Sequence, residues 1–137
     1  MSLTRWTTTI ADAMAVTVTV ETANPGEGEP GRVLDIDVRV CRPPEWPADR
    51  VQESPWGPTE VLMFETLMRS WSLSIKRGAP LLEVLQPDQR FEPAGHTTDP
   101  LIPVCRSPVD YVSRAIIARF VLGKTSGRAE EFKGPLS

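Results

Sequence analysis

The stretch MAVTVTV, residues 14–20, alternates larger apolar side chains with alanine or threonine at every second position. A period of two is typical of a β-strand that turns one face to a core and the other to water or a partner. A threonine-rich run, residues 4–10, precedes this stretch, and Ala11-Asp12-Ala13 separates the two. The chain is therefore predicted to begin with two neighbouring strands.

The same alternation returns over residues 32–41, after a loop rich in glycine, proline and glutamate. One set of side chains is apolar and the other is polar or small: Leu34, Ile36, Val38 and Val40 against Asp35, Asp37, Arg39 and Cys41. A strand of this kind belongs to an antiparallel sheet with one solvated face.

A helix is predicted over residues 59–77, with Thr59 as its cap and Gly78 as its terminator. The apolar positions recur with a helical period, and two further residues widen the stripe: Val61, Phe64, Met68, Trp71 and Ile75, with Met63 and Leu67. We expect this helix to lie across the sheet.

Two more elements follow. PLLEVLQP, residues 80–87, is short, apolar and bounded by prolines, which favours a strand. A second helix is predicted over residues 108–122, with Ser107 as N-cap, Pro108 in the first turn and Gly123 at its end.

The predicted fold class is therefore α+β. We expect an antiparallel sheet of about four strands, in the order β-β-β-α-β-α, with two helices packed on it. Residues 1–123 form one domain in this interpretation, and residues 124–137 form a flexible C-terminal tail.

Composition restricts the function classes. The 18 acidic and 15 basic residues give a net charge of −3, which lacks the positive footprint of a nucleic-acid-binding protein. The first 20 residues do not resemble a secretory signal, and no run of 18 apolar residues occurs. We expect a cytoplasmic protein that binds neither membrane nor nucleic acid.

Chemistry-bearing residues are few. The single histidine, His96, has no second histidine to complete an acid–base pair, and the two cysteines show no metal-ligand spacing. GKTSG, residues 123–127, follows a helix and lacks the first glycine of a phosphate loop. We therefore predict no metal and no cofactor. Asp35 and Asp37, which share one side of a strand, are the remaining candidates for catalysis together with His96.

A binding role is favoured over catalysis. On a helical projection of residues 108–122, Ile117 and Val121 lie opposite the main apolar face, so a second covering surface is needed. Trp46 and Trp56 lie between prolines, where a rigid indole suits an interface.

The hypothesis is a small non-enzymatic binding or assembly protein that acts through protein–protein contacts, with a second copy of itself or another protein as partner. Trp46, Trp56, Ile117 and Val121 are its predicted contact residues. The alternative is a ligand-binding protein or a hydrolase- or isomerase-type enzyme. It requires a sheet-and-helix pocket into which Asp35, Asp37 or His96 points.

Overall fold

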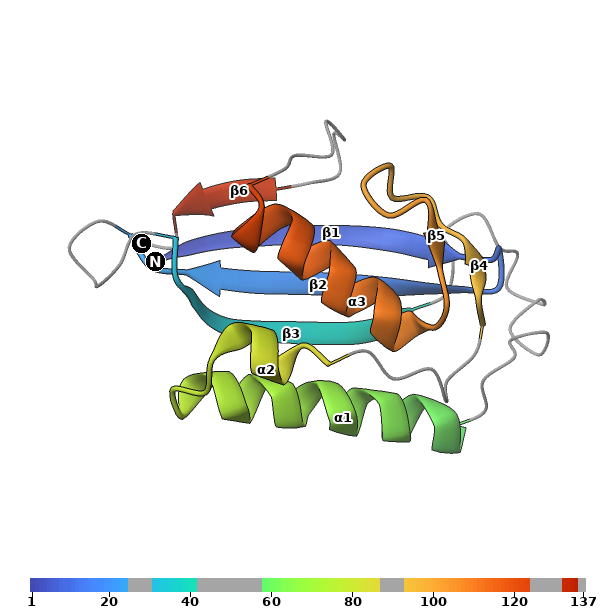
Figure 1. Cartoon of the computed structure of the whole chain (residues 1–137). Helices are drawn as coiled ribbons and strands as arrows, with labels where there is room; N and C mark the ends of the chain where they lie inside the picture. The colour runs from blue at the N-terminus through green and yellow to red at the C-terminus, as the bar shows by residue number, and fades with distance from the viewer. Residues whose placement is uncertain (25–30, 42–57, 87–92, 124–131, 136–137) are drawn as a thin grey trace.

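The helices of this α+β fold lie against one face of a four-stranded antiparallel sheet (Figure 1). The computed structural model describes residues 1–24, 31–41, 58–86, 93–123 and 132–135. The elements are β1 (Ser2–Ile10), β2 (Met14–Thr22), β3 (Val33–Cys41), α1 (Pro58–Lys76), α2 (Leu81–Val84), β4 (Gly95–His96), β5 (Val104–Cys105), α3 (Pro108–Ile116), the π-helical turn η2 (Ile117–Val121) and β6 (Phe132–Pro135). The α+β class predicted from the sequence is confirmed.

The hairpin of β1 and β2 is the centre of the sheet, as the alternation predicts. Pairing runs without interruption from Ser2 opposite Thr22 to Ile10 opposite Met14. Ala13 N donates to the carbonyl of Ile10, and the turn holds Ala11 and Asp12 at φ of 54° and 53°. Two consecutive left-handed residues define the tight turn whose twist matches an antiparallel pair.

Strands β3 and β6 complete the sheet in the order β3-β2-β1-β6. β3 pairs antiparallel with β2, and β6 pairs with the first part of β1, from Ser2 to Arg5. β6 belongs to the segment that the sequence analysis assigned to a C-terminal tail. The fourth strand of the sheet therefore comes from the end of the chain and not from residues 80–87.

Helix α1 runs alongside β3 (Figure 1) and contains the predicted apolar stripe. Phe64, Met68, Trp71 and Ile75 are buried. Met63, expected to widen the stripe, is exposed, because it lies on the same flank as half-buried Leu67 but farther from the centre of the buried face, about 100° from Phe64. Gly78 ends the helix in the left-handed conformation, at φ 91°.

The strand predicted over residues 80–87 is wrong. Residues Leu81–Val84 form the single helical turn α2, with Val84 N and Leu85 N bonded to the carbonyls of Pro80 and Leu81. Proline fixes φ near the helical value and lacks the donor that a first helical turn leaves unpaired, so it starts a helix as readily as it bounds a strand. The predicted order β-β-β-α-β-α therefore differs from the observed order after the first helix.

A separate two-stranded ribbon, β4 with β5, precedes α3. It joins the end of the main hairpin, because Thr97 bridges Ile10 and Ala11 N donates to the carbonyl of His96 over 2.7 Å. α3 then lies across β1 and β2 (Figure 1). This route carries the chain from α2 back over the sheet.

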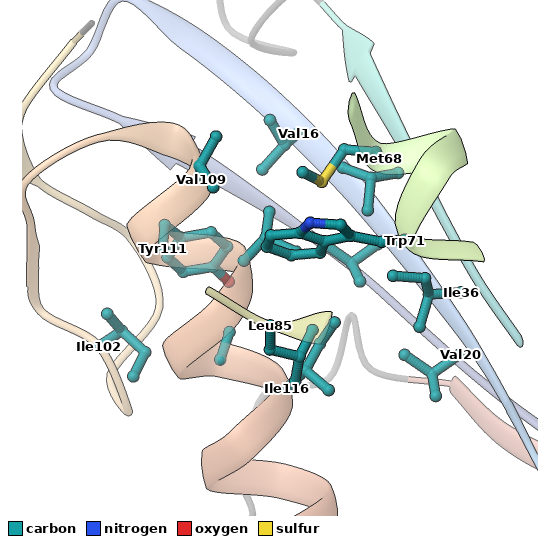
Figure 2. Close-up of a cluster of buried hydrophobic side chains, with 14 of the residues drawn as sticks. Val16, Val20, Ile36, Met68, Trp71, Leu85, Ile102, Val109, Tyr111 and Ile116 are labelled. Carbon is teal, nitrogen blue, oxygen red and sulfur yellow. The ribbon is translucent and has the colours of Figure 1, made fainter. Parts of the chain in front are cut away.

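The core lies between the sheet and the helices. Figure 2 shows side chains from each layer in one cluster: Val16, Val20 and Ile36 from the sheet, Met68 and Trp71 from α1, and Val109, Tyr111 and Ile116 from α3. Leu85 and Ile102, from the connecting segments, close its sides. None of the helices in the described ranges combines the length and hydropathy that crossing a lipid bilayer requires.

Candidate functional site

The start of α3 is built as its sequence indicates. Ser107 is the N-cap, and its Oγ accepts from Asp110 N at 2.9 Å. Pro108 occupies the first turn, and Asp110 Oδ2 accepts from Arg106 N at 2.9 Å. The capped end holds α3 in place beside the β4–β5 ribbon.

Much of the second side of α3 is covered by the chain itself. On its main apolar face, Val109, Val112, Ala115 and Ile116 are fully buried. Ser113 Oγ donates to the carbonyl of Leu85 at 2.6 Å, and Arg114 Nη1 donates to the carbonyl of Val104 at 2.7 Å. The segment after α2 and the ribbon therefore cover the flanks of α3 beside its main face, whereas a partner was expected at Ile117 and Val121.

The end of the helix stays open. Ile117 is half-buried, whereas Val121 is 46% exposed and Leu122 is 62% exposed. The last turn is a π-turn in which Leu122 N donates to the carbonyl of Ile117 at 2.9 Å. Ile117, Val121 and Leu122, here called the helix-end patch, are apolar residues at this end that intrachain contacts leave partly or largely exposed.

Beneath the patch, the same turn directs Arg119 into the protein. Its Nη1 lies 2.9 Å from Asp99 Oδ2, and the two side chains are 4% and 0% exposed. Its guanidinium carbon lies 4.2 Å from the centroid of the Trp6 ring. A buried carboxylate and an indole face thus share the arginine charge, as an ion pair and a cation–π contact.

Tyr111 completes this network. Its Oη donates to Asp99 Oδ2 at 2.6 Å and accepts from Trp6 Nε1 at 2.8 Å and from Thr8 Oγ1 at 2.6 Å. Burial, reinforced by the Asp99 charge, raises the pKa of Tyr111 well above its ordinary value. The phenol therefore stays protonated and acts as a hydrogen-bonding centre between the sheet, the 97–106 segment and α3.

This network was not predicted from the sequence, although one signal for it was present. On a helical projection, Arg119 falls on the side of Val112 and Ala115 and not on the side of Arg114. An arginine on a buried helix face predicts a buried acidic partner, because an unpaired buried charge is strongly destabilising. Its burial also removes Arg119 from any basic surface that could contact nucleic acid.

Asp35 and Asp37 line one groove, whereas His96 lies away from it. Asp35 pairs with Glu21 near one end of β2, whereas the His96 carbonyl accepts from Ala11 at the turn before the other end. Most of the nine-residue strand β2 separates the two positions, which at about 3.3 Å per residue is roughly 25 Å. Asp37 is exposed and pairs with its strand neighbour Arg39 at 3.2 Å.

Asp35 lies in a shallow polar groove between β3 and α1. Its Oδ1 accepts from Ile36 N at 2.8 Å and from Ser72 Oγ, and its Oδ2 lies 3.3 Å from Lys76 Nζ. Glu65 Oε2 accepts from Val40 N at 3.0 Å along the same edge. The groove measures about 150 Å³, below the roughly 300–1,000 Å³ of typical ligand pockets, and its carboxylates are occupied in closing the edge of β3.

Neither cysteine forms a disulfide. Cys105 is buried, and burial raises the pKa of its thiol. Cys41 is half-buried beside Thr17 Oγ1, at 3.6 Å, and both cysteines are free thiols. Within the described ranges, no three His, Cys, Asp or Glu side chains are grouped so as to hold a metal ion.

Trp46 and Trp56 lie outside the described residues. Of the four predicted contact residues, the structure therefore places Ile117 and Val121, both at the open end of the α3–η2 helix. No protein-family model, no curated protein and no solved structure matches this chain.

Proposed function

We propose that this chain is a small non-enzymatic binding protein that associates with other protein chains, a second copy of itself first among them, through the helix-end patch. The observation that carries the proposal is the exposure of Val121 and Leu122 beside half-buried Ile117 and Phe120. Apolar side chains gathered at one helix end favour removal from water. Trp46 and Trp56 stay in the proposal as further contact residues, on their sequence setting alone.

The free energy that burial of the helix-end patch can contribute favours weak association. Burying a whole Val or Leu side chain contributes about 1.5–3 kcal/mol, so covering the exposed half of Val121 and Leu122 contributes about 1–1.5 kcal/mol each. A two-fold symmetric contact doubles the set, which gives roughly 4–6 kcal/mol. The loss of translational and rotational freedom costs about 4–15 kcal/mol. Dissociation in the high micromolar to millimolar range requires a net binding free energy of about −4 to −5 kcal/mol, so Val121 and Leu122 need the further contact that Ile117, Trp46 and Trp56 would supply.

Cytosolic location belongs to the same proposal. Both cysteines are free, and Cys105 is buried in the core, which suits a reducing compartment. The acidic composition and the burial of Arg119 support a protein partner over a nucleic acid.

Sedimentation velocity from 10 µM to 1 mM tests the proposal on the full chain. We expect the sedimentation coefficient of the wild type to rise with concentration, and Leu122→Lys to abolish the rise, since lysine retains helix propensity and adds a charge. Leu62→Lys is the matched control, because Leu62 is 64% exposed on α1. A wild type that stays monomeric at 1 mM, or a Leu122→Lys variant that associates like the wild type, would contradict the proposal.

A further inference from the structure

A second, larger groove lies at the end of the sheet where β3 begins. It measures about 380 Å³, within the roughly 300–1,000 Å³ of small-molecule sites. Three chain segments distant in sequence form it: the start of β3, the turn from α1 into α2, and the η2 turn. We call it the β3–α2 groove.

The lining is apolar in its side chains except at one place. Val33 and Ile75 are buried, and Leu81 and Phe120 are half-buried. Arg32 is exposed and is the one charged side chain among the groove's lining residues. A hydrocarbon tail would lie against the exposed parts of Leu81 and Phe120, and a negative charge would meet Arg32.

Two backbone carbonyls at the end of α1 are already hydrogen-bonded within the chain. Gly78 N donates to the carbonyl of Ile75 and Ala79 N donates to the carbonyl of Ser74, each at 3.0 Å. These two bonds form the Schellman arrangement, which satisfies the carbonyls that a helix end otherwise presents. Among the described residues, no carboxylate forms a salt bridge with Arg32.

From this lining we infer that the β3–α2 groove binds a small amphipathic carboxylate, with its apolar tail against Ile75, Leu81 and Phe120 and its carboxylate on Arg32. The guanidinium fork matches a carboxylate in two parallel hydrogen bonds. This ligand site goes beyond the proposed protein–protein role, and it needs no residue of the helix-end patch.

Octanoate is the probe, and methyl NMR of the full-length protein measures its binding. Octanoate has ten non-hydrogen atoms. A binding free energy per atom toward the low end of the range for small ligands gives an expected dissociation constant of about 1 mM. Shifts should concentrate on the methyl groups of Val33, Ile75 and Leu81. Octylammonium, with the same tail and the opposite charge, should leave these methyls unshifted up to about 10 mM.

Variants of the protein test the contribution of the octanoate carboxylate to binding separately from that of its hydrocarbon tail. Arg32→Gln should weaken octanoate binding roughly tenfold, the loss of one charged hydrogen-bonding partner, while Arg69→Gln, an exposed arginine of α1 outside this groove, should leave it unchanged. Leu122→Lys should bind octanoate like the wild type, which separates this site from self-association. The thermal midpoints of all variants verify folding.

Three results would overturn the inference. One is the absence of shifts at the groove methyls with octanoate at about 10 mM. The second is equal affinity of the wild type and Arg32→Gln. The third is a shift of the same methyls with protein concentration alone, which would make a second copy of the chain the occupant.

Discussion

Replacing Arg119 by methionine should destabilise the protein far more than a change at a helix end usually does. Methionine keeps the length and apolar bulk of the side chain and removes its charge. Asp99 would then be left with its carboxylate fully buried and hydrogen-bonded to Tyr111. The perturbation therefore tests whether the buried network, and not apolar contact alone, fixes α3 on the sheet.

The structure sets the size of the effect. Asp99 keeps hydrogen bonds from Tyr111 Oη and from Leu101 N, at 2.6 and 3.0 Å, but loses its ion pair with Arg119. Breaking a buried ion pair from one side costs about 3–5 kcal/mol. The double variant Asp99→Asn/Arg119→Met removes the stranded charge and retains an acceptor oxygen, so it should be at least about 2 kcal/mol more stable than Arg119→Met.

Urea unfolding at pH 7, followed by far-UV circular dichroism, measures the free energy of unfolding of each variant. Arg114→Met is the matched control on the same helix, since Arg114 is 47% exposed and its pair with Asp110 spans 3.4 Å. It should cost about 1 kcal/mol or less.

The reasoning is refuted if Arg119→Met lies within about 1 kcal/mol of the wild type with an unchanged dependence on urea. It is also refuted if the double variant is less stable than the single one. Either result would mean that the buried charges contribute little and that apolar packing alone holds the helix.

Three further outcomes follow from the same contacts. Burial raises the pKa of Tyr111 above its ordinary 10.0, so the unfolded chain loses the phenol proton at a lower pH than the folded protein. The free energy of unfolding should therefore fall above pH 10, by up to about 1.4 kcal/mol per pH unit. Tyr111→Phe should flatten this decline. Ser107→Ala removes the acceptor for Asp110 N and should cost about 1 kcal/mol in urea unfolding. Asp12→Gly relieves a left-handed residue at φ 53° and should raise the thermal midpoint, with a gain of about 0.5–1 kcal/mol; a lower midpoint would contradict the turn geometry.

The sheet could be predicted from the sequence because its signal is local. Alternation over residues 14–20 and 32–41 specifies which side chains face the core, and Ile36 and Val38 are buried as that pattern requires. Gly78 and Gly123 end their helices for an equally local reason, since both adopt positive φ. Patterns that depend on one strand or one helical turn are visible without knowledge of the rest of the fold.

Other features depend on contacts between distant segments. PLLEVLQP has the composition of a buried strand, yet Pro80 begins a helical turn there, and of its described residues, 80–86, Val84 and Leu85 are the buried ones. β6 pairs with β1 across almost the whole length of the chain. No periodicity within residues 132–135 could predict such a pairing.

The candidate site was predicted in part for the same reason. The helical projection separated Ile117 and Val121 from the buried face, but it could not show that the ribbon and the segment after α2 cover most of α3. The network of Asp99, Tyr111 and Arg119 joins a connecting segment to two turns of helix. Its members become neighbours only once α3 lies on the sheet.

The most direct test of the central claim is an isotope-filtered nuclear Overhauser measurement on a mixture of labelled and unlabelled full-length protein at about 1 mM. The account predicts intermolecular contacts from the methyl groups of Ile117, Val121 and Leu122. Intermolecular contacts that arise only from other exposed apolar residues, such as Leu62 on α1, or the absence of any, would contradict it.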